Sequence, residues 1–107
     1  ETSPVKLSET LTVCPDENKV YYYQGIPTEA GTVMQVTNYS ETGIRKVIAD
    51  LKAKVGSNFT IVIKPTKKAK YRNMIDMLDE CAITNNKRYA LLEIDPDTEA
   101  LIKRSGK

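Results

Sequence analysis

The chain has 107 residues, of which 28% are charged and 40% hydrophobic, and its formal net charge is +2. This composition is typical of one globular domain with a modest core and excludes a disordered chain. The charge is too close to neutral to predict nucleic-acid binding, and the chain has neither an apolar run that could span a bilayer nor a signal peptide. The chain starts at Glu1 rather than Met, so we expect an excised part of a longer protein. We expect a single domain over residues 1–107 with flexible ends at 1–6 and 104–107.

Two strands joined by a short loop are predicted at the start of the chain. Residues 7–13 alternate loosely between apolar and polar side chains, and residues 19–24 are rich in the β-branched and aromatic types that suit a half-buried strand. Turn-forming residues at 15–18 separate them, which predicts a β-hairpin. Residues 25–31 are predicted to form a loop, and a short extra strand is expected over residues 32–37.

An amphipathic helix is predicted next. Its apolar positions recur at the helical period and are Ile44, Val47, Ile48, Leu51 and Val55. Asn38 with Glu41 is a candidate capping box at its start, and Ser40 or Thr42 are alternative N-caps. Gly56 is the expected end of the helix, because glycine adopts the left-handed conformation freely.

A central strand and a second helix give the clearest pattern in the chain. Residues 59–63 are β-branched and nearly all apolar, which is typical of a strand in the middle of a sheet, and Pro65 ends the run. The second helix is expected to start near Lys68. Its predicted buried stripe consists of Tyr71, Met74, Ile75, Leu78 and Ala82.

A last strand and helix complete the predicted fold. Residues 88–94 predict a strand, and Asp95 is the expected N-cap of a short helix that has Pro96 at its first position. The strand–helix–strand unit over residues 59–94 implies parallel pairing through a right-handed crossover. The sequence thus predicts an α+β (α/β two-layer) fold: a mixed β-sheet with two main helices on one face, an N-terminal β-hairpin and a short C-terminal helix.

The residue types that carry most catalysis and metal binding are absent or badly placed. There is no histidine, which removes the Ser-His-Asp and Cys-His arrangements and the commonest transition-metal ligand. Asp76, Asp79 and Glu80 are interpreted as the solvated face of the second helix rather than as an acid/base pair. We therefore predict no enzyme activity, no cofactor and no metal site.

Two further groups of reactive or charged residues receive a structural interpretation. Cys14 and Cys81 have no Cys-x-x-Cys spacing, so we predict two buried free thiols, with a bridge between them left open for an oxidising compartment. A basic cluster follows the central strand and is interpreted as a solvated loop rather than a phosphate site, because no glycine-rich loop accompanies it. The cluster consists of Lys64, Lys67, Lys68, Lys70 and Arg72.

Three consecutive tyrosines are candidates for a binding surface. Tyr21, Tyr22 and Tyr23 lie in one predicted strand, so their rings point alternately to the two faces of the sheet. Either at least one ring is exposed at an interface, or one ring lies in the core while the others cover the sheet.

Short phrases in a fixed order extend over most of the chain, from about Leu11 to Glu99. The phrases are Val20-Tyr21-Tyr22-Tyr23, Tyr39-Ser40 before Gly43-Ile44-Arg45-Lys46-Val47, Ile63-Lys64-Pro65 before Ala69-Lys70-Tyr71-Arg72-Asn73, Asp76 with Leu78-Asp79-Glu80, and Lys87-Arg88-Tyr89-Ala90. Together they resemble the ExbD/TolR family of biopolymer-transport proteins, most closely ExbD. Many members carry Arg-x-Asp where this chain has Lys64-Pro65-Thr66, so any role of that acidic residue does not transfer.

The resemblance implies the periplasmic domain of a single-pass protein of the bacterial inner membrane. The transmembrane helix, with its proton-responsive aspartate, lies outside this chain. The family works as a homodimer inside an ExbB-like channel oligomer and uses the proton motive force to energise TonB for outer-membrane active transport. The domain is expected to act by dimerising and by binding TonB in the periplasm. Alternatives are a TolR-like subunit in envelope maintenance, or a small α/β ligand-binding domain with residues 25–37 as a lid.

A sheet edge is the expected partner site, because an added strand gains main-chain hydrogen bonds without strict sequence demands. Two strands are candidates for this edge, residues 19–24 and residues 88–94. The candidate partner-binding or dimer-edge residues on them are Tyr21, Tyr22, Tyr23, Arg88, Tyr89 and Leu91.

Overall fold

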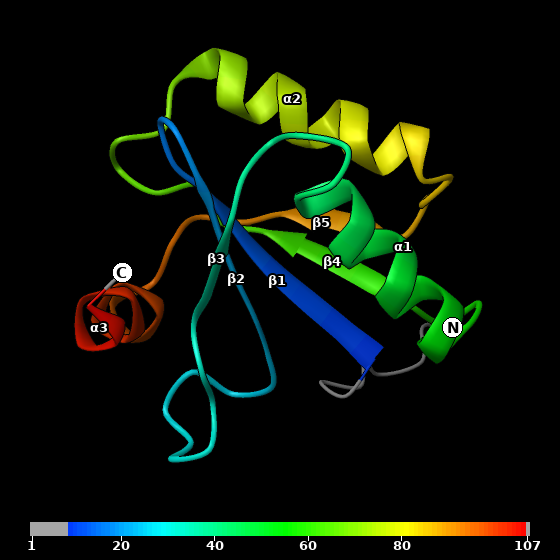
Figure 1. The fold of residues 1–107 in the computed structure, drawn as a ribbon. Helices are drawn as coiled ribbons and strands as arrows, with labels where there is room; N and C mark the ends of the chain where they lie inside the picture. The colour runs from blue at the N-terminus through cyan, green and yellow to red at the C-terminus, as the bar shows by residue number, and fades with distance from the viewer. Residues whose placement is uncertain (1–8, 107) are drawn as a thin grey trace.

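A mixed five-stranded sheet organises the computed structural model, which describes residues 9–106 (Figure 1). The strand order is β3-β2-β1-β4-β5, and three helices pack on the sheet, which confirms the predicted fold class. The elements in chain order are β1 (Thr10–Pro15), β2 (Val20–Gln24), β3 (Gln35–Thr37), α1 (Ile44–Val55), β4 (Thr60–Ile63), α2 (Tyr71–Ile83), β5 (Tyr89–Leu91) and α3 (Pro96–Ser105).

Strand β1 lies at the centre of the sheet, and all six of its residues are buried. It pairs antiparallel with β2, with Val13 opposite Tyr22, and parallel with β4, with Val13 opposite Ile63. Strand β5 pairs parallel with β4. Both the predicted hairpin and the predicted parallel strand–helix–strand unit are therefore confirmed.

Helix α1 buries the predicted stripe but begins differently from the prediction. Ile44 and Ile48 are fully buried, and the remaining stripe residues pack against the same core. The expected capping box is wrong, because the Oδ1 atom of Asn38 accepts from the backbone N–H of Ser40 at 3.0 Å and no side chain caps the helix. Gly56 ends the helix as predicted, with φ of 95°.

Helix α2 turns a different face to the sheet from the predicted one. It starts at Tyr71 rather than near Lys68, with Lys70 as its N-cap, and its buried residues are Asn73, Met77, Glu80 and Cys81. In contrast, Tyr71 is 80% exposed and Ile75 is 37% exposed. The predicted buried stripe is therefore wrong at Tyr71, Ile75 and Ala82, which are exposed, whereas Leu78 packs against the larger core.

Polar contacts explain which face of α2 is buried. Glu80 was expected in solvent, but its carboxylate accepts from the Nε and Nη2 atoms of Arg45 on α1 at 2.8 and 3.1 Å. Asn73 accepts from the backbone N–H of Lys70 and donates to the backbone oxygen of Glu17 in the β1–β2 turn. Both polar side chains therefore have partners, and neither leaves an unsatisfied polar atom in the core.

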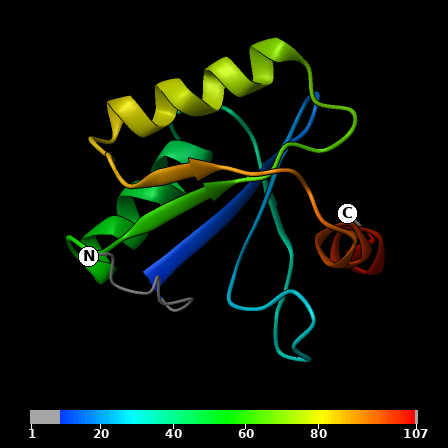
Figure 2. The same ribbon diagram turned by 180° about the vertical axis from the view of Figure 1, so that it is seen from behind.

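The helices cover the sheet from both sides (Figure 2). Helices α1 and α2 enclose the larger core, which contains Ile61, Ile63 and Cys81. Helix α3 covers the opposite face, where Leu101 packs in a smaller cluster with Cys14, Tyr21, Tyr23 and Met34. The two cysteines are buried and free, as predicted, and they belong to these two different clusters.

The ends of several elements differ from their predicted bounds. Strand β5 is much shorter than residues 88–94, and β3 occupies only the second half of residues 32–37. Helix α3 has Asp95 as N-cap, as predicted, and it continues through Ser105, so its last turn includes the first two residues of the segment 104–107 for which flexibility is expected. The expected flexible segment at residues 1–6 lies outside the described residues. Within residues 9–106, no helix is long and apolar enough to cross a membrane.

Candidate strand-pairing site

Among the described residues, no strand pairs with the outer edge of β5. Ile61 of β4 donates its N–H to the backbone oxygen of Arg88, and Leu92 donates its N–H to the oxygen of Ile63, both at 2.9 Å. In a parallel ladder, successive residues point their backbone groups to opposite sides, so Arg88, Ala90 and Leu92 face β4 and the residues that alternate with them face away. The N–H and C=O groups of Tyr89 and Leu91 therefore face outward from the last strand of the described sheet.

The side chains of these two residues are also incompletely packed. Tyr89 lies beside Ile61 and Leu91 beside Ile63, so they extend two fully buried rows of the core beyond β4. Yet Tyr89 is 47% exposed and Leu91 is 52% exposed. A further strand beside β5 would continue the same rows and remove this apolar surface from water.

Helix α2 forms a wall along this edge (Figure 1). Its Leu78 and Ala82 line a hollow of about 410 Å³ together with Tyr89. Its Met74 lines a second hollow, of about 660 Å³, together with Leu91. We call the surface formed by these five residues the β5–α2 groove. It uses the apolar stripe of α2 that the sequence predicted to be buried.

Opposite charges lie at the two ends of the groove. Exposed Lys87 and Arg88 precede β5, and exposed Glu93 follows it. The guanidinium of Arg88 also donates to the hydroxyl of Thr60 at 3.3 Å, which holds this side chain against β4. An incoming strand therefore meets the apolar side chains of the groove between the positive charges that precede β5 and the negative charge that follows it.

The hairpin strand does not provide the expected edge. Strand β2 lies between β1 and β3, so the expectation that it is an edge strand is wrong. Tyr21 and Tyr23 are buried on the α3 face, and Tyr22 is half-buried against the larger core. Of the six predicted site residues, the structure brings Arg88, Tyr89 and Leu91 together at a free edge.

A polar network holds α3 against the end of β4. The ammonium of Lys64 donates to Asp95 at 2.7 Å, Thr98 donates to the same carboxylate, and the hydroxyls of Tyr23 and Thr98 lie 2.9 Å apart. Burial alone would raise the pKa of Asp95, but the hydrogen bonds from Lys64 and Thr98 outweigh it and hold the pKa at about 2. The network fixes the position of the segment that connects β5 to α3.

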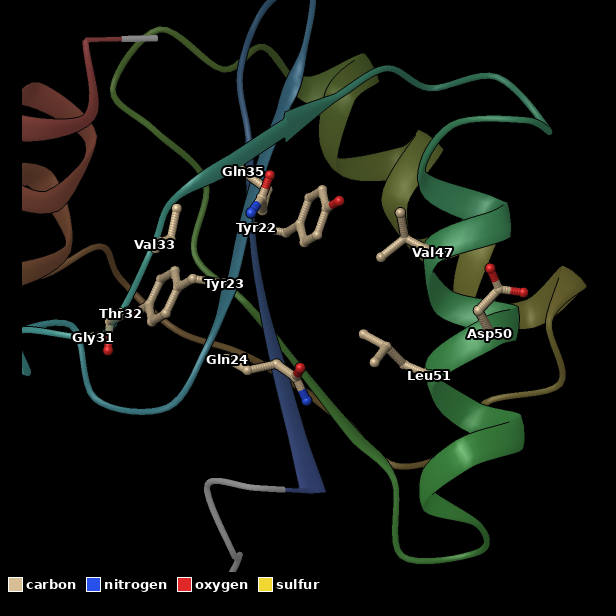
Figure 3. A pocket seen from close by; sticks show the side chains of 10 residues that line it. All are labelled: Tyr22, Tyr23, Gln24, Gly31, Thr32, Val33, Gln35, Val47, Asp50 and Leu51. Carbon is tan, nitrogen blue, oxygen red and sulfur yellow. The ribbon is translucent and has the colours of Figure 1, made fainter.

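A separate cleft of about 510 Å³ lies between α1 and the β2–β3 pair (Figure 3). The Tyr22 ring extends toward Val47 and Leu51 of α1, whereas the Tyr23 ring extends to the other side of the sheet. The amides of Gln24 and Gln35 and the carboxylate of Asp50 also line it, as do loop residues 31–33. Its mixed lining differs from the deep apolar pocket that a ligand-binding domain would favour.

No family model, curated protein or solved structure matches this chain. Among the described residues, no three His, Cys, Asp or Glu side chains gather where they could hold a metal ion. The fold and the site together define an α+β domain with an open apolar sheet edge. The open edge was predictable from the sequence, but the contribution of α2 was not.

Proposed function

We propose that this chain is the periplasmic coupling domain of an ExbD-like subunit in a proton-driven inner-membrane motor. Its role is to bind a strand of a TonB-like partner, which the motor energises for outer-membrane transport. The observation that carries this proposal is the β5 edge, where Tyr89 and Leu91 present backbone groups and apolar side chains to the same incoming strand. The short sequence motifs that resemble ExbD are the basis for proposing this motor and this partner.

Amide shift mapping tests the partner site. The periplasmic part of the TonB-like protein is titrated into the isotope-labelled chain, and we expect the largest shifts at the amides of Tyr89 to Leu92 and along α2. Leu91→Asp places a charge in the groove and is expected to abolish binding, whereas Val36→Asp, at the opposite edge, leaves it unchanged. Shifts confined to α1, α3 or β3 contradict the proposal.

A second copy of the chain is the competing occupant of this edge, and we propose that the homodimer forms there. If two β5 strands pair antiparallel about a two-fold axis at Ala90, Tyr89 lies opposite Leu91 of the second copy and Lys87 lies opposite its Glu93. Each pairing occurs twice by symmetry. Because one edge holds one strand, self-pairing and partner binding exclude each other.

Charge exchange tests this pairing. Lys87→Glu sets two like-charged pairs across the axis, so self-association measured by sedimentation velocity is expected to weaken. Adding Glu93→Lys to the same chain restores opposite charges and is expected to restore association. Equal association of the parent, the single variant and the double variant counts against this register.

A further inference from the structure

The basic cluster after β4 lies beside a cleft that the sequence did not reveal. Lys67 and Lys68 from this cluster meet Lys19 of the β1–β2 turn and Lys103 of α3 around a hollow of about 270 Å³. We call this hollow the basic cleft. Its other lining residues are Asp16, Tyr21, Thr66, Ile94, Glu99 and Ile102.

The floor of the basic cleft is apolar. Tyr21 is only 5% exposed, and Ile94 and Ile102 are half-buried. The ammonium of Lys19 lies 5.2 Å from the centre of the Tyr21 ring, at the edge of this floor. An apolar side chain of a ligand would therefore be removed from water here, with cations around it.

The charge of the lining is positive, because four lysines face two acids. Both acids already have partners: the Asp16 carboxylate accepts from the hydroxyl of Thr66, and Glu99 pairs with Lys67 at 3.5 Å. Among the described residues, Lys68 and Lys103 take part in no ion pair. These two ammonium groups are available to a carboxylate from outside.

The basic cleft continues from the β5–α2 groove. The hollow beside Leu91 and the basic cleft share four lining residues. The shared residues are Thr66, Lys67, Ile94 and Glu99. A peptide that leaves the groove past Leu91 thus crosses the Lys67–Glu99 ion pair and enters the cleft.

We propose that the strand bound at β5 extends into the basic cleft with a segment that places a carboxylate beside an apolar side chain. The carboxylate lies between Lys68 and Lys103, and the apolar side chain covers Tyr21 and Ile102. This inference rests on the proposed strand pairing and adds the chemistry of the partner. A phosphate group fits less well. The lining has no arginine, whose guanidinium could form two parallel hydrogen bonds, and no glycine-rich turn, whose backbone N–H groups could bind phosphate oxygens.

A displayed library of random dodecapeptides, selected against the chain, tests the inference without a known partner. We expect enriched peptides to join an alternating apolar segment to an acidic residue with an apolar neighbour. The best peptide is then measured by fluorescence polarisation. Lys68→Glu/Lys103→Glu is expected to weaken its binding at least about tenfold, and the charge-matched control Lys46→Glu/Lys54→Glu on α1 less than about twofold.

The outcomes separate the inference from the proposed function. If Leu91→Asp abolishes binding but Lys68→Glu/Lys103→Glu does not weaken it, strand pairing stands and the acidic extension is overturned. If neither variant weakens binding, both fall. No enrichment of acidic peptides also overturns the inference, as does lysine-dependent binding to phosphatidylglycerol vesicles in place of peptides. The inference is supported if Leu91→Asp and Lys68→Glu/Lys103→Glu both weaken peptide binding and the peptide shifts the amide signals of Ile102 and Lys103.

Discussion

Removal of the Arg45 guanidinium tests how α2 is held in the orientation that leaves Tyr71 and Ile75 exposed. Arg45 makes two hydrogen bonds to Glu80, whose side chain is 7% exposed, while that of Arg45 is 33% exposed. Breaking a buried ion pair leaves an uncompensated charge and typically costs about 3–5 kcal/mol. Since Arg45 is partly solvated, we expect Arg45→Met to lower the free energy of unfolding by about 3 kcal/mol.

Urea unfolding followed by circular dichroism measures this loss. Arg45→Met/Glu80→Leu removes both charges, so we expect it to lie within about 1 kcal/mol of the parent, which is far from the sum of the single changes. Lys46→Met is the matched control, because it breaks an exposed pair with Asp50 on the same helix and should cost less than about 0.5 kcal/mol. A loss below about 1 kcal/mol for Arg45→Met, or a double variant as unstable as the sum, refutes the reasoning.

Three further predictions concern positions away from this pair. Because the pKa of Asp95 is about 2 when folded, below its ordinary value of 3.8, its contribution to stability is present above about pH 4 and falls as the pH drops toward 2. After allowance for its partial exposure we expect about 1 kcal/mol, absent in Asp95→Asn when acid unfolding curves are compared. Burial raises the pKa of Cys14 to about 12 and that of Cys81 to about 11, so neither thiol should react with Ellman's reagent until urea unfolds the chain; fast labelling of the folded chain contradicts this. Gly56→Ala should cost about 1–3 kcal/mol in thermal unfolding, because φ is 95° and ψ is −155°, whereas Gly31→Ala should be near neutral; equal effects refute the backbone explanation.

The sequence predicted the positions of the helices and strands better than it predicted which side of each helix is buried. In α1 the apolar residues form one stripe, so period alone identifies the buried side. In α2 apolar residues lie on two sides, with Met77 and Cys81 on one and Tyr71 and Ile75 on the other. A count of apolar positions favours the second side, but tertiary contacts bury the first.

The contacts that decide this are distant in sequence. Glu80 is buried because Arg45 reaches it from α1, and Asn73 is buried because the β1–β2 turn offers the oxygen of Glu17. Neither partner is visible in the local pattern of α2. The same limit applies to the candidate site, since β5 could be predicted as an edge but the wall beside it could not. The prediction of α2 failed at the surface that we propose to be functional.

The parallel order of β5, β4 and β1 gives the site a mechanical property. A strand bound at β5 and pulled along its own axis would load its main-chain hydrogen bonds together, because these bonds run across the pulling direction. The tension then passes through the β5–β4 and β4–β1 ladders into the buried centre of the sheet, and no single bond has to resist it alone. Peeling the same strand sideways would break the bonds one after another at far lower force. A sheet edge of this kind holds under lengthwise traction and releases its ligand when the direction of pull turns.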